Sequence, residues 1–224
     1  MIRSLEAGEW GPGDAIPSEG DLAARFNVSQ GTVRKAIDEM AAENLLVRRQ
    51  GRGTFVASHD DPRSFYRFLR LVPDDGSAAQ TVSVPLSCAT KGADPEVAAA
   101  LGLSVGEPVI YVERLLRFNG EAVVYDQIHL LSDLFAGLTL ASLSGGERSL
   151  YSVFENDYGV RMIRAEEHLR AVAADPVSAK LLSVQAGAPL LLVERTAYTY
   201  GEKPVEWRRG LYCTNRHYYR NDLG

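Results

Sequence analysis

A duplicated segment in the second half of the chain limits its fold more than any other sequence feature. Residues 94–124 and 175–205 share the same amino acid at 12 of 31 positions, without a gap, at an offset of 81 residues. Each copy opens with Asp-Pro, and because Asp is a good N-cap and proline fits the first helical position, a short apolar helix is expected there. A Gly-x-Pro loop then leads into an extended run, and an Asn-Gly or Tyr-Gly turn returns a partner strand.

Two helix-plus-hairpin units with further strands around them predict an α+β fold, in which one antiparallel sheet has flanking helices. The additional strands are expected at residues 64–72, at 81–89, which Pro85 interrupts, and at 162–173. An amphipathic helix is expected at 149–158. A polar, proline-ended stretch separates this region from the N-terminal part. We therefore expect domains at residues 1–58 and 64–224, joined by a linker at 59–63.

The N-terminal part predicts two short helices joined by a tight turn. Ser18, followed three residues later by Asp21, is a capping pattern, and Ser29 is a good N-cap for the second helix. In the second helix one face is apolar, with Val33, Ala36, Ile37 and Met40, and the opposite face holds Gly31, Arg34, Lys35 and Asp38. A helix of this kind suits the major groove of DNA. Gly31 would allow close approach to a phosphate, and Arg34 could reach a phosphate or the acceptors of guanine.

A predicted β-hairpin follows the helices. Residues 45–49 and 54–56 are strand-like, and the turn Gln50-Gly51-Arg52-Gly53 between them places one cation between two glycines. If only the two helices are considered, ordinary packing of small helices with solvent-exposed cations explains their sequence pattern as well as DNA binding does. The hairpin favours DNA, since Arg48, Arg49 and Arg52 could all face a phosphate backbone.

Together these motifs resemble the winged-helix domain of the GntR transcriptional regulators over residues 2–56. The matching residues are Pro17–Glu19, Leu22-Ala23, Phe26, Val28-Ser29, Thr32–Arg34, Ala36, Leu45-Leu46 and Gly51–Val56. Family members often have Arg where this chain has Gly20 and Gln30, so most of the base reading is expected to fall on Arg34. The DNA-binding residues that the resemblance implies are Ser18, Ser29, Gln30, Gly31, Thr32, Arg34, Lys35, Arg49, Arg52 and Gly53.

The remainder, from about residue 64 to 220, resembles the UTRA effector-binding domain of the HutC subfamily, whose fold is like that of chorismate lyase. The similar residues are Leu101–Leu103, Gly106–Pro108, Glu113-Arg114, Ser149–Tyr151, Leu190–Arg195, Pro204–Glu206 and Tyr212. In related domains the effector lies between the two hairpins. The resemblance therefore implies effector contacts from Arg114, Asp126, Ser149, Tyr151, Glu206 and Tyr212.

The chemistry of these residues allows both a binding and a structural role. Arg114 could clamp a carboxylate or phosphate, and the start of a helix at Ser149 favours an anion. Equally, Ser149 could be only a cap and Tyr151 only core. Glu113-Arg114 recurs as Glu194-Arg195, which indicates that at least one pair is a structural salt bridge. Relatives that bind sugar phosphates often have a second Arg where this chain has Leu116, which makes a less charged ligand plausible.

Composition narrows the class of protein further. The net charge is −5, and the first 58 residues hold seven Lys/Arg against eight Asp/Glu, so DNA binding would have to rely on local clustering, as between Arg34 and Arg52. Cys88 and Cys213 are far apart and read as buried or free thiols of a reducing compartment, and the four histidines form no short cluster, so no metal or cofactor is expected. No run is long and apolar enough to span a membrane and no signal-peptide pattern is present, which favours a cytoplasmic protein.

Two functional hypotheses remain at this point. The first is a ligand-responsive transcription factor, most simply a repressor, that binds a roughly palindromic operator as a homodimer, because one winged helix reads only a half-site. Its effector would be a sugar phosphate, a carboxylate or an amino-acid-like molecule. The second is a small-molecule-binding or lyase-like protein whose N-terminal domain contacts other proteins. No nucleophile–base pair, metal set or phosphate loop is visible in the sequence, so we do not expect an enzyme.

Overall fold

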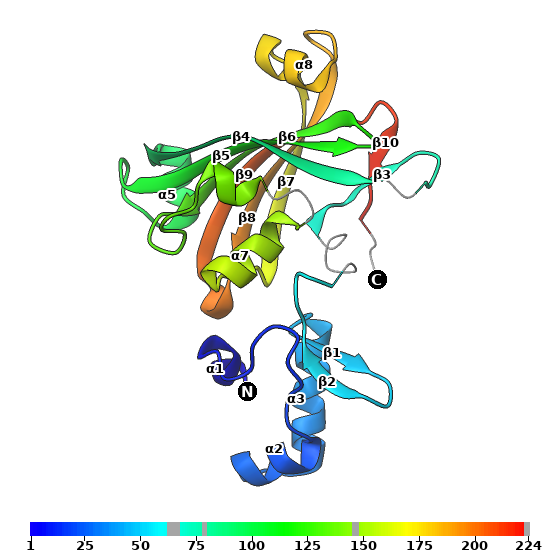
Figure 1. Ribbon diagram of the computed structural model, residues 1–224, viewed down its shortest axis with the longest axis vertical. Coiled ribbons are helices and arrows are strands. Elements are labelled where there is room, and N and C mark those ends of the chain that lie inside the picture. The colour runs from blue at the N-terminus through cyan, green and yellow to red at the C-terminus, as the bar shows by residue number, and fades with distance from the viewer. Residues whose placement is uncertain (62–67, 78–79, 145–147, 222–224) are drawn as a thin grey trace. The chain divides into compact units, whose positions relative to one another are not determined.

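The chain folds into two compact units, Met1–Ser64 and Phe65–Gly224, drawn as a ribbon in Figure 1. The computed structural model describes residues 1–61, 68–77, 80–144 and 148–221. In the described residues, the first unit holds three helices and a hairpin, and the second holds a large antiparallel sheet with helices on both of its faces. The α+β fold expected from the sequence is confirmed.

The first unit is a helix–turn–helix followed by a hairpin. Its elements are α1 (Ile2–Glu6), α2 (Glu19–Phe26), α3 (Gln30–Ala42), β1 (Leu46–Arg49) and β2 (Gly53–Val56). Ser18 and Ser29 cap α2 and α3 as predicted, each accepting the backbone N–H three residues later. Asn27 ends α2 in the left-handed region at φ 52°, which produces the tight turn between the helices.

The apolar face of α3 forms the centre of this unit. Val33, Ile37 and Met40 are at most 4% exposed, as the helical periodicity predicted, while Ala36 is half-buried. These side chains belong to a core that also contains Leu22 of α2 and Leu46 of β1. The polar face of α3 is consequently fixed toward solvent.

The second unit is built on a six-stranded antiparallel sheet of order β4-β5-β6-β9-β8-β7, with a separate β3-β10 pair. The strands are β3 (Leu71–Pro73), β4 (Thr81–Gly92), β5 (Pro108–Phe118), β6 (Glu121–Leu131), β7 (Arg164–Ala173), β8 (Pro189–Tyr198), β9 (Pro204–Tyr212) and β10 (His217–Tyr219). The helices whose bounds lie in the described residues are α5 (Pro95–Leu101), α6 (Leu140–Leu143), α7 (Leu150–Tyr158), α8 (Pro176–Leu182) and the short 3-10 turn η1 (Tyr200–Glu202).

The sequence repeat appears as two equivalent halves of this sheet. Asp94 and Asp175 cap α5 and α8, and each accepts two backbone N–H groups. The hairpins β5-β6 and β8-β9 follow, and β6 pairs with β9 so that the halves meet at the centre. In the first hairpin, Asn119 and Gly120 have φ values of 49° and 89°, as a tight hairpin turn requires.

One predicted strand differs from the structure. Within the described residues, the strand expected at 64–72 is found only at Leu71–Pro73, where it pairs with β10, and Phe68 is helical rather than extended. Residues 64–67 of that prediction lie outside the described residues. In contrast, Pro85 does not end its strand. Proline has no N–H to donate, but β4 lies at the sheet edge and a bulge between Pro85 and Ser87 interrupts the regular ladder there, so proline is tolerated.

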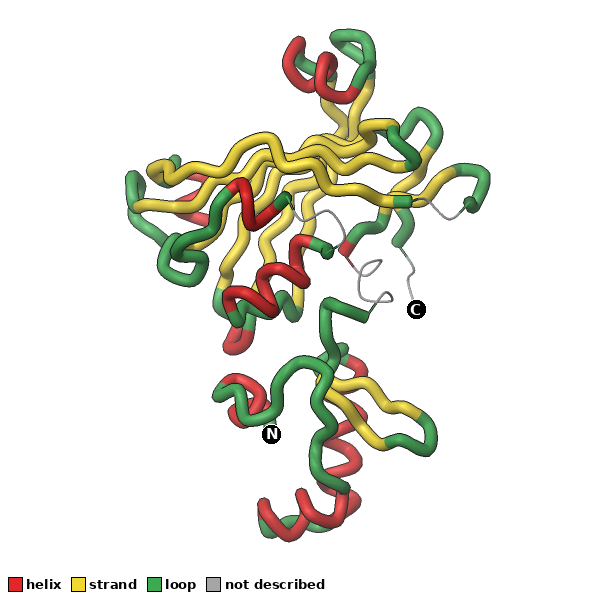
Figure 2. Tube along the Cα trace, in the orientation of Figure 1, coloured by secondary structure: helices red, strands yellow, loops and turns green. Residues whose placement is uncertain are grey.

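The two faces of the sheet have different chemistry. Leu115, Leu192 and Leu211 point toward α8 and form an apolar layer with it. Because neighbouring strand residues point to opposite faces, Arg114 and Arg208 point the other way, toward α7. Figures 1 and 2 show α7 and α8 on opposite sides of the sheet. The face that carries α7 therefore holds an unusual set of buried charges.

Candidate DNA-binding surface and ligand site

All ten residues predicted to bind DNA lie on the exposed surface of the first unit. Gly31, Arg34 and Lys35 occupy the open face of α3. Ser29 and Thr32 meet at the start of that helix, where the Ser29 Oγ lies 2.9 Å from the Thr32 Oγ1 and accepts the Thr32 N–H at 3.1 Å. The helix N-terminus is thus capped by hydroxyl groups, without a carboxylate that would repel a phosphate.

Arg34 is held in place by a carboxylate that sequence reasoning did not assign. Its Nε and Nη2 donate to Glu19 Oε2 at 3.0 and 2.7 Å, and this hydrogen bonding lowers the pKa of Glu19. Arg48 is similarly paired with Asp38 at 2.7 Å. Two of the cations near the expected groove-facing surface are therefore already oriented by acidic neighbours.

The hairpin tip has the backbone geometry that its glycines suggested. Gly51 and Gly53 have φ values of 70° and 105°, which favour glycine. The guanidinium of Arg49 lies 4.8 Å from the centroid of the Phe55 ring, and a cation–π contact therefore orients it along the hairpin. Arg52 is exposed at the tip between the two glycines.

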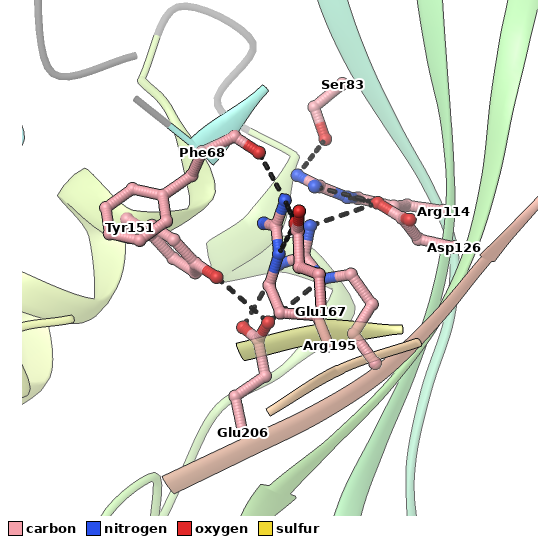
Figure 3. Close-up of polar contacts among 9 residues, drawn as sticks. Phe68, Ser83, Arg114, Asp126, Tyr151, Glu167, Arg195 and Glu206 are labelled. Carbon is pink, nitrogen blue, oxygen red and sulfur yellow. Dashed lines mark hydrogen bonds and ion pairs between the residues drawn. The ribbon is translucent and has the colours of Figure 1, made fainter. Parts of the chain in front are cut away.

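In the second unit a buried polar cluster lies on the sheet face toward α7, and Figure 3 shows most of it. Arg114 of β5 donates through Nε to Asp126 Oδ2 of β6 at 2.9 Å. Arg208 of β9 donates to both oxygens of Glu206 at 2.9 and 3.0 Å and reaches Asp126 Oδ2 at 3.3 Å. The Tyr151 hydroxyl of α7 donates to Glu206 at 3.0 Å. Side chains from both hairpins and from α7 therefore converge on one point.

Arg195 extends this cluster toward the start of the unit. Its Nε donates to Glu167 of β7 at 2.7 Å, and its Nη2 donates to the backbone carbonyl of Phe68. The Phe68 ring also packs edge-on against the Tyr151 ring, with centroids 4.9 Å apart. Phe68 thus touches two members of the cluster, as Figure 3 shows.

The cluster combines three guanidiniums with three carboxylates. They are Arg114, Arg195, Arg208, Asp126, Glu167 and Glu206. Burial lowers the pKa of Arg114, although the negative charge of Asp126 opposes the shift, and burial raises the pKa of Tyr151. Charges so deeply buried are tolerated because they are paired. Any charged ligand group entering here would exchange partners with an existing pair.

Asp126 has one oxygen without a hydrogen-bond partner among the described residues. The side chain is completely buried, and while Oδ2 binds two guanidiniums, Oδ1 accepts no hydrogen bond. Gly210 lies beside it, and a Cβ added there would come within 2.8 Å of Oδ1. A buried acceptor of this kind costs free energy unless a donor reaches it. The cluster is therefore incomplete as a purely structural network.

Four of the six predicted effector contacts meet in this cluster: Arg114, Asp126, Tyr151 and Glu206. Tyr212 lies beside it across Gly210, is 1% exposed, and has its pKa raised to about 12 by burial. Ser149 is the cap of α7, accepting the Ser152 N–H at 3.1 Å, and no described contact joins it to the cluster.

Sequence reasoning missed Arg208 and Glu167, and treated Arg195 only as the repeat of Arg114. The alternation Glu206-x-Arg208 on a strand was the available signal, because it places both side chains on one face. The sequence also indicated that at least one of the repeated Glu-Arg pairs forms a structural salt bridge. Glu194 pairs with Arg170 while Arg195 pairs with Glu167, so the two neighbours serve opposite faces.

Neither a metal-binding cluster nor a membrane-spanning helix is found in the described ranges. No group of three or more His, Cys, Asp or Glu side chains is placed to hold a metal ion there. Within the same ranges, no helix is long and apolar enough to cross a membrane.

Comparison with protein families matches both units. Residues 1–56 match the family model "Bacterial regulatory proteins, gntR family", and residues 79–218 match the UTRA domain. Among curated proteins, the HTH-type transcriptional repressor PhnF of Mycolicibacterium smegmatis is 31% identical over 91% of this chain and 82% of its own length. The HTH-type transcriptional repressor NagR of Bacillus subtilis is 27% identical over 97% and 88% of the respective chains.

Solved structures give the same result. A ligand-binding domain assigned to the GntR family of regulators from Bordetella bronchiseptica is 47% identical, with a TM-score of 0.69 over 71% of this chain and 99% of that domain. The crystal structure of PhnF from Mycobacterium smegmatis is 25% identical, with a TM-score of 0.59 over 100% and 98% of the two chains.

Proposed function

Because this chain belongs to the GntR family of transcriptional regulators and carries a UTRA effector-binding domain, we propose that it represses transcription as a homodimer on a roughly palindromic operator and releases DNA when a small polar molecule enters the buried cluster. One winged helix reads a half-site, which is the physical reason for a two-fold assembly. For the domain limits we propose residues 1–58 and 64–224 with a linker at 59–63.

The observation that supports the ligand site best is the unsatisfied Oδ1 of Asp126, within a cluster drawn from both hairpins. Its position favours a ligand that brings an O–H or N–H donor. The guanidiniums of Arg114 and Arg208 favour a carboxylate or phosphate on the same molecule. A sugar phosphate, a hydroxycarboxylate and an amino-acid-like molecule each combine these groups.

Leu116 separates these ligand classes. It is 4% exposed and packs in an apolar cluster with Leu69 and Leu71, so the strand offers no second cation two residues after Arg114. A dianionic phosphate would then have to draw more guanidinium charge from existing pairs than a monoanionic carboxylate would. We therefore rank a carboxylate with a hydroxyl or amino group ahead of a sugar phosphate.

Coupling between the two sites is proposed to run through Phe68. Its carbonyl accepts from Arg195 and its ring packs on Tyr151, and the chain from the DNA-binding unit reaches the sheet domain at this point. A ligand acceptor that recruits Arg195 would release the carbonyl. The restraint that this hydrogen bond places on the chain after the linker would then be lost. The affinity of the DNA-binding unit for its operator would change as a result.

We propose no catalytic activity. The relatives are transcriptional regulators, and the described cluster pairs its carboxylates with guanidiniums and has no nucleophile beside a general base.

A binding titration tests the proposal. Labelled duplexes from upstream of the gene and its neighbours would be titrated with the full chain, and the retained fragment would then be titrated with ligands of the three classes, chosen by thermal shift. We expect one fragment with two half-sites to bind preferentially, and a ligand that raises the melting temperature to weaken that binding. Preference for no fragment, or operator affinity that no stabilising ligand changes, would contradict the proposal.

A further inference from the structure

A cavity of about 400 Å³ lies in the second unit, away from the buried polar cluster. Its lining comes from the end of α8 with the residues after it, from the turn between β5 and β6, and from the chain at 213–217. None of the lining residues belongs to the cluster around Asp126. Protein interiors leave few voids larger than a water molecule, so a space of this size is a candidate ligand site.

The lining divides into an apolar floor and a polar rim. Val123 and Leu182 are each 3% exposed, whereas Arg117, Glu121 and Arg216 reach solvent. Small-molecule sites have the same construction, because apolar walls bury the body of the ligand and a few polar groups fix its orientation.

The charges on the rim leave room for an anion. The Arg117 Nη1 donates to the Gly120 carbonyl at 3.0 Å, and the Arg216 Nη2 donates to both Glu121 oxygens at 3.1 Å. The Arg216 and Glu121 side chains are 76% and 61% exposed, so their pair is weak and easily exchanged. Burial lowers the pKa of His217, which is therefore neutral at pH 7. Two guanidiniums against one carboxylate leave one positive charge in the lining.

The residue after α8 adds a hydroxyl to the lining at a conformational cost. Ser183 ends α8 in the left-handed region at φ 56°, whereas Gly102 ends α5 at φ 68°, at the equivalent position of the repeat. Glycine adopts this conformation freely and serine does not. Residues held in such conformations cluster at binding sites, where their side chains have a use.

We propose that this cavity is a second ligand site, which binds a small monoanionic carboxylate with an apolar body. Arg117 and Arg216 hold the carboxylate, since a guanidinium matches its geometry and the single excess positive charge matches its charge. Arg216 exchanges its exposed pair for the ligand, and the Ser183 hydroxyl donates a further hydrogen bond. The apolar body lies against Val123 and Leu182. The site does not depend on the proposed effector cluster.

Cys213 lies in the lining and reports whether the cavity is occupied. In the full chain with Cys88→Ala it is the one remaining cysteine, and its alkylation by uncharged iodoacetamide is followed by mass spectrometry. Hexanoate, benzoate and phenylpropionate are the probes, with benzamide and phenyl phosphate for comparison. Because only the empty site reacts, a carboxylate at about ten times its dissociation constant should slow alkylation roughly ten-fold. Benzamide should have little effect.

A matched pair of variants tests the role of charge in this protection. Arg117→Gln should weaken the protection that benzoate gives. Arg164→Gln is the control, because Arg164 is also partly exposed and pairs with Glu202 at 2.6 Å, at the turn of the other hairpin. It should leave the protection unchanged.

Two further variants act in opposite directions without threatening the fold. Glu121→Gln removes the carboxylate that competes for Arg216, and should therefore strengthen protection. Ser183→Gly relieves the left-handed conformation, so the variant should fold at least as stably as the wild type, but it should bind benzoate more weakly.

Saturable protection by at least one carboxylate, weakened by Arg117→Gln and not by Arg164→Gln, supports the site. Absence of protection by all three carboxylates would overturn it. Equal protection by benzamide and benzoate would overturn the anion, and stronger protection by phenyl phosphate than by benzoate would overturn the monoanion. A ligand bound only at the Asp126 cluster would leave Cys213 reactive, and no operator DNA is used. The proposed function and this second site can therefore fail independently.

Discussion

At the scale of one residue, the guanidinium of Arg34, which we propose reads a base, is oriented before DNA arrives. Glu19 fixes its guanidinium through two donors, so less rotamer freedom has to be lost on binding. We expect Arg34→Ala to reduce operator affinity roughly 10- to 100-fold and to relax the preference for operator over random DNA. Lys35→Ala should weaken binding to both DNAs alike and reduce the salt slope by about one.

Anisotropy titrations of both variants on operator and random duplexes, at two salt concentrations, check this prediction. If Arg34→Ala lowered affinity for the two duplexes by the same factor, Arg34 would be a phosphate contact and base reading would lie elsewhere.

Asp126 is the residue on which the buried cluster depends most for its balance of charge. It is fully buried and its Oδ2 serves two guanidiniums, so Asp126→Asn leaves Arg114 and Arg208 short of one negative charge. We expect the free energy of unfolding to fall by about 3–5 kcal/mol, measured by urea denaturation. Glu121→Gln is the control, because its pair with Arg216 is solvent-exposed and should matter little. Similar effects from both substitutions would contradict a strongly coupled cluster.

The raised pKa of Tyr212 predicts how the free energy of unfolding depends on pH in the alkaline range. Burial raises its pKa to about 12 in the folded state, against about 10 for an unperturbed tyrosine. The folded form thus prefers the neutral phenol, so this stabilisation is complete below pH 10 and is lost as the pH rises toward 12. We expect Tyr212 to contribute a loss of about 2–3 kcal/mol between these limits.

Denaturation at a series of pH values tests this, with Tyr212→Phe as the comparison. The variant should lose less stability than the wild type over the same interval. Equal losses in the two proteins would assign the alkaline sensitivity to other tyrosines, such as Tyr111, whose pKa burial also raises to about 12.

At the scale of elements, the start of α7 distinguishes a cap from a ligand contact. Ser149 accepts the Ser152 N–H, so Ser149→Ala should destabilise the fold by about 1 kcal/mol, whereas Ser149→Asp should retain the cap and the stability. Thermal denaturation measures both. Ligand affinity should be nearly unchanged in the Asp variant if the residue is only a cap. A large loss of affinity in that folded variant would instead place Ser149 at the ligand.

Elements with local signals could be predicted well from the sequence. The caps at Asp94 and Asp175, the Asn119-Gly120 turn and the periodicity of α3 are all set by nearest neighbours, and the structure has each of them. The strand expected at 64–72 was wrong in extent, because alternation of apolar residues does not show which partner strand is present.

The proposed ligand site was only partly predictable, for a physical reason. Arg114, Asp126, Tyr151 and Glu206 came from a resemblance to known domains, and they do converge. The partners Glu167 and Arg208 depend on strand order, since β7 and β9 meet β8 only in the folded sheet. The same is true of Glu19, whose bond to Arg34 joins residues on two helices.

At the scale of the whole molecule, the repeat explains why the proposed ligand site lies next to a contact with the chain that follows the linker. Each half of the sheet contributes one arginine at the equivalent strand position, Arg114 and Arg195. Their roles have diverged, because Arg114 binds Asp126 within the cluster while Arg195 also holds the Phe68 carbonyl. We propose that the half with Arg114 serves the ligand, and that the half with Arg195 reports the presence of the ligand to the chain that follows the linker.

This division of roles predicts the behaviour of Phe68→Ala in the full chain. Losing the ring contact with Tyr151 should leave operator affinity without ligand close to that of the wild type, since the DNA-binding unit is untouched. The factor by which ligand weakens operator binding should fall toward one. Because coupling between two sites is reciprocal, operator DNA should also cease to weaken ligand binding, by the same factor. Calorimetry with and without operator measures the second quantity independently of the first.

If both factors kept their wild-type values, the Phe68 ring would not be part of the coupling. If they changed unequally, the titrations would be reporting something other than a two-site equilibrium, and the linkage argument would fail.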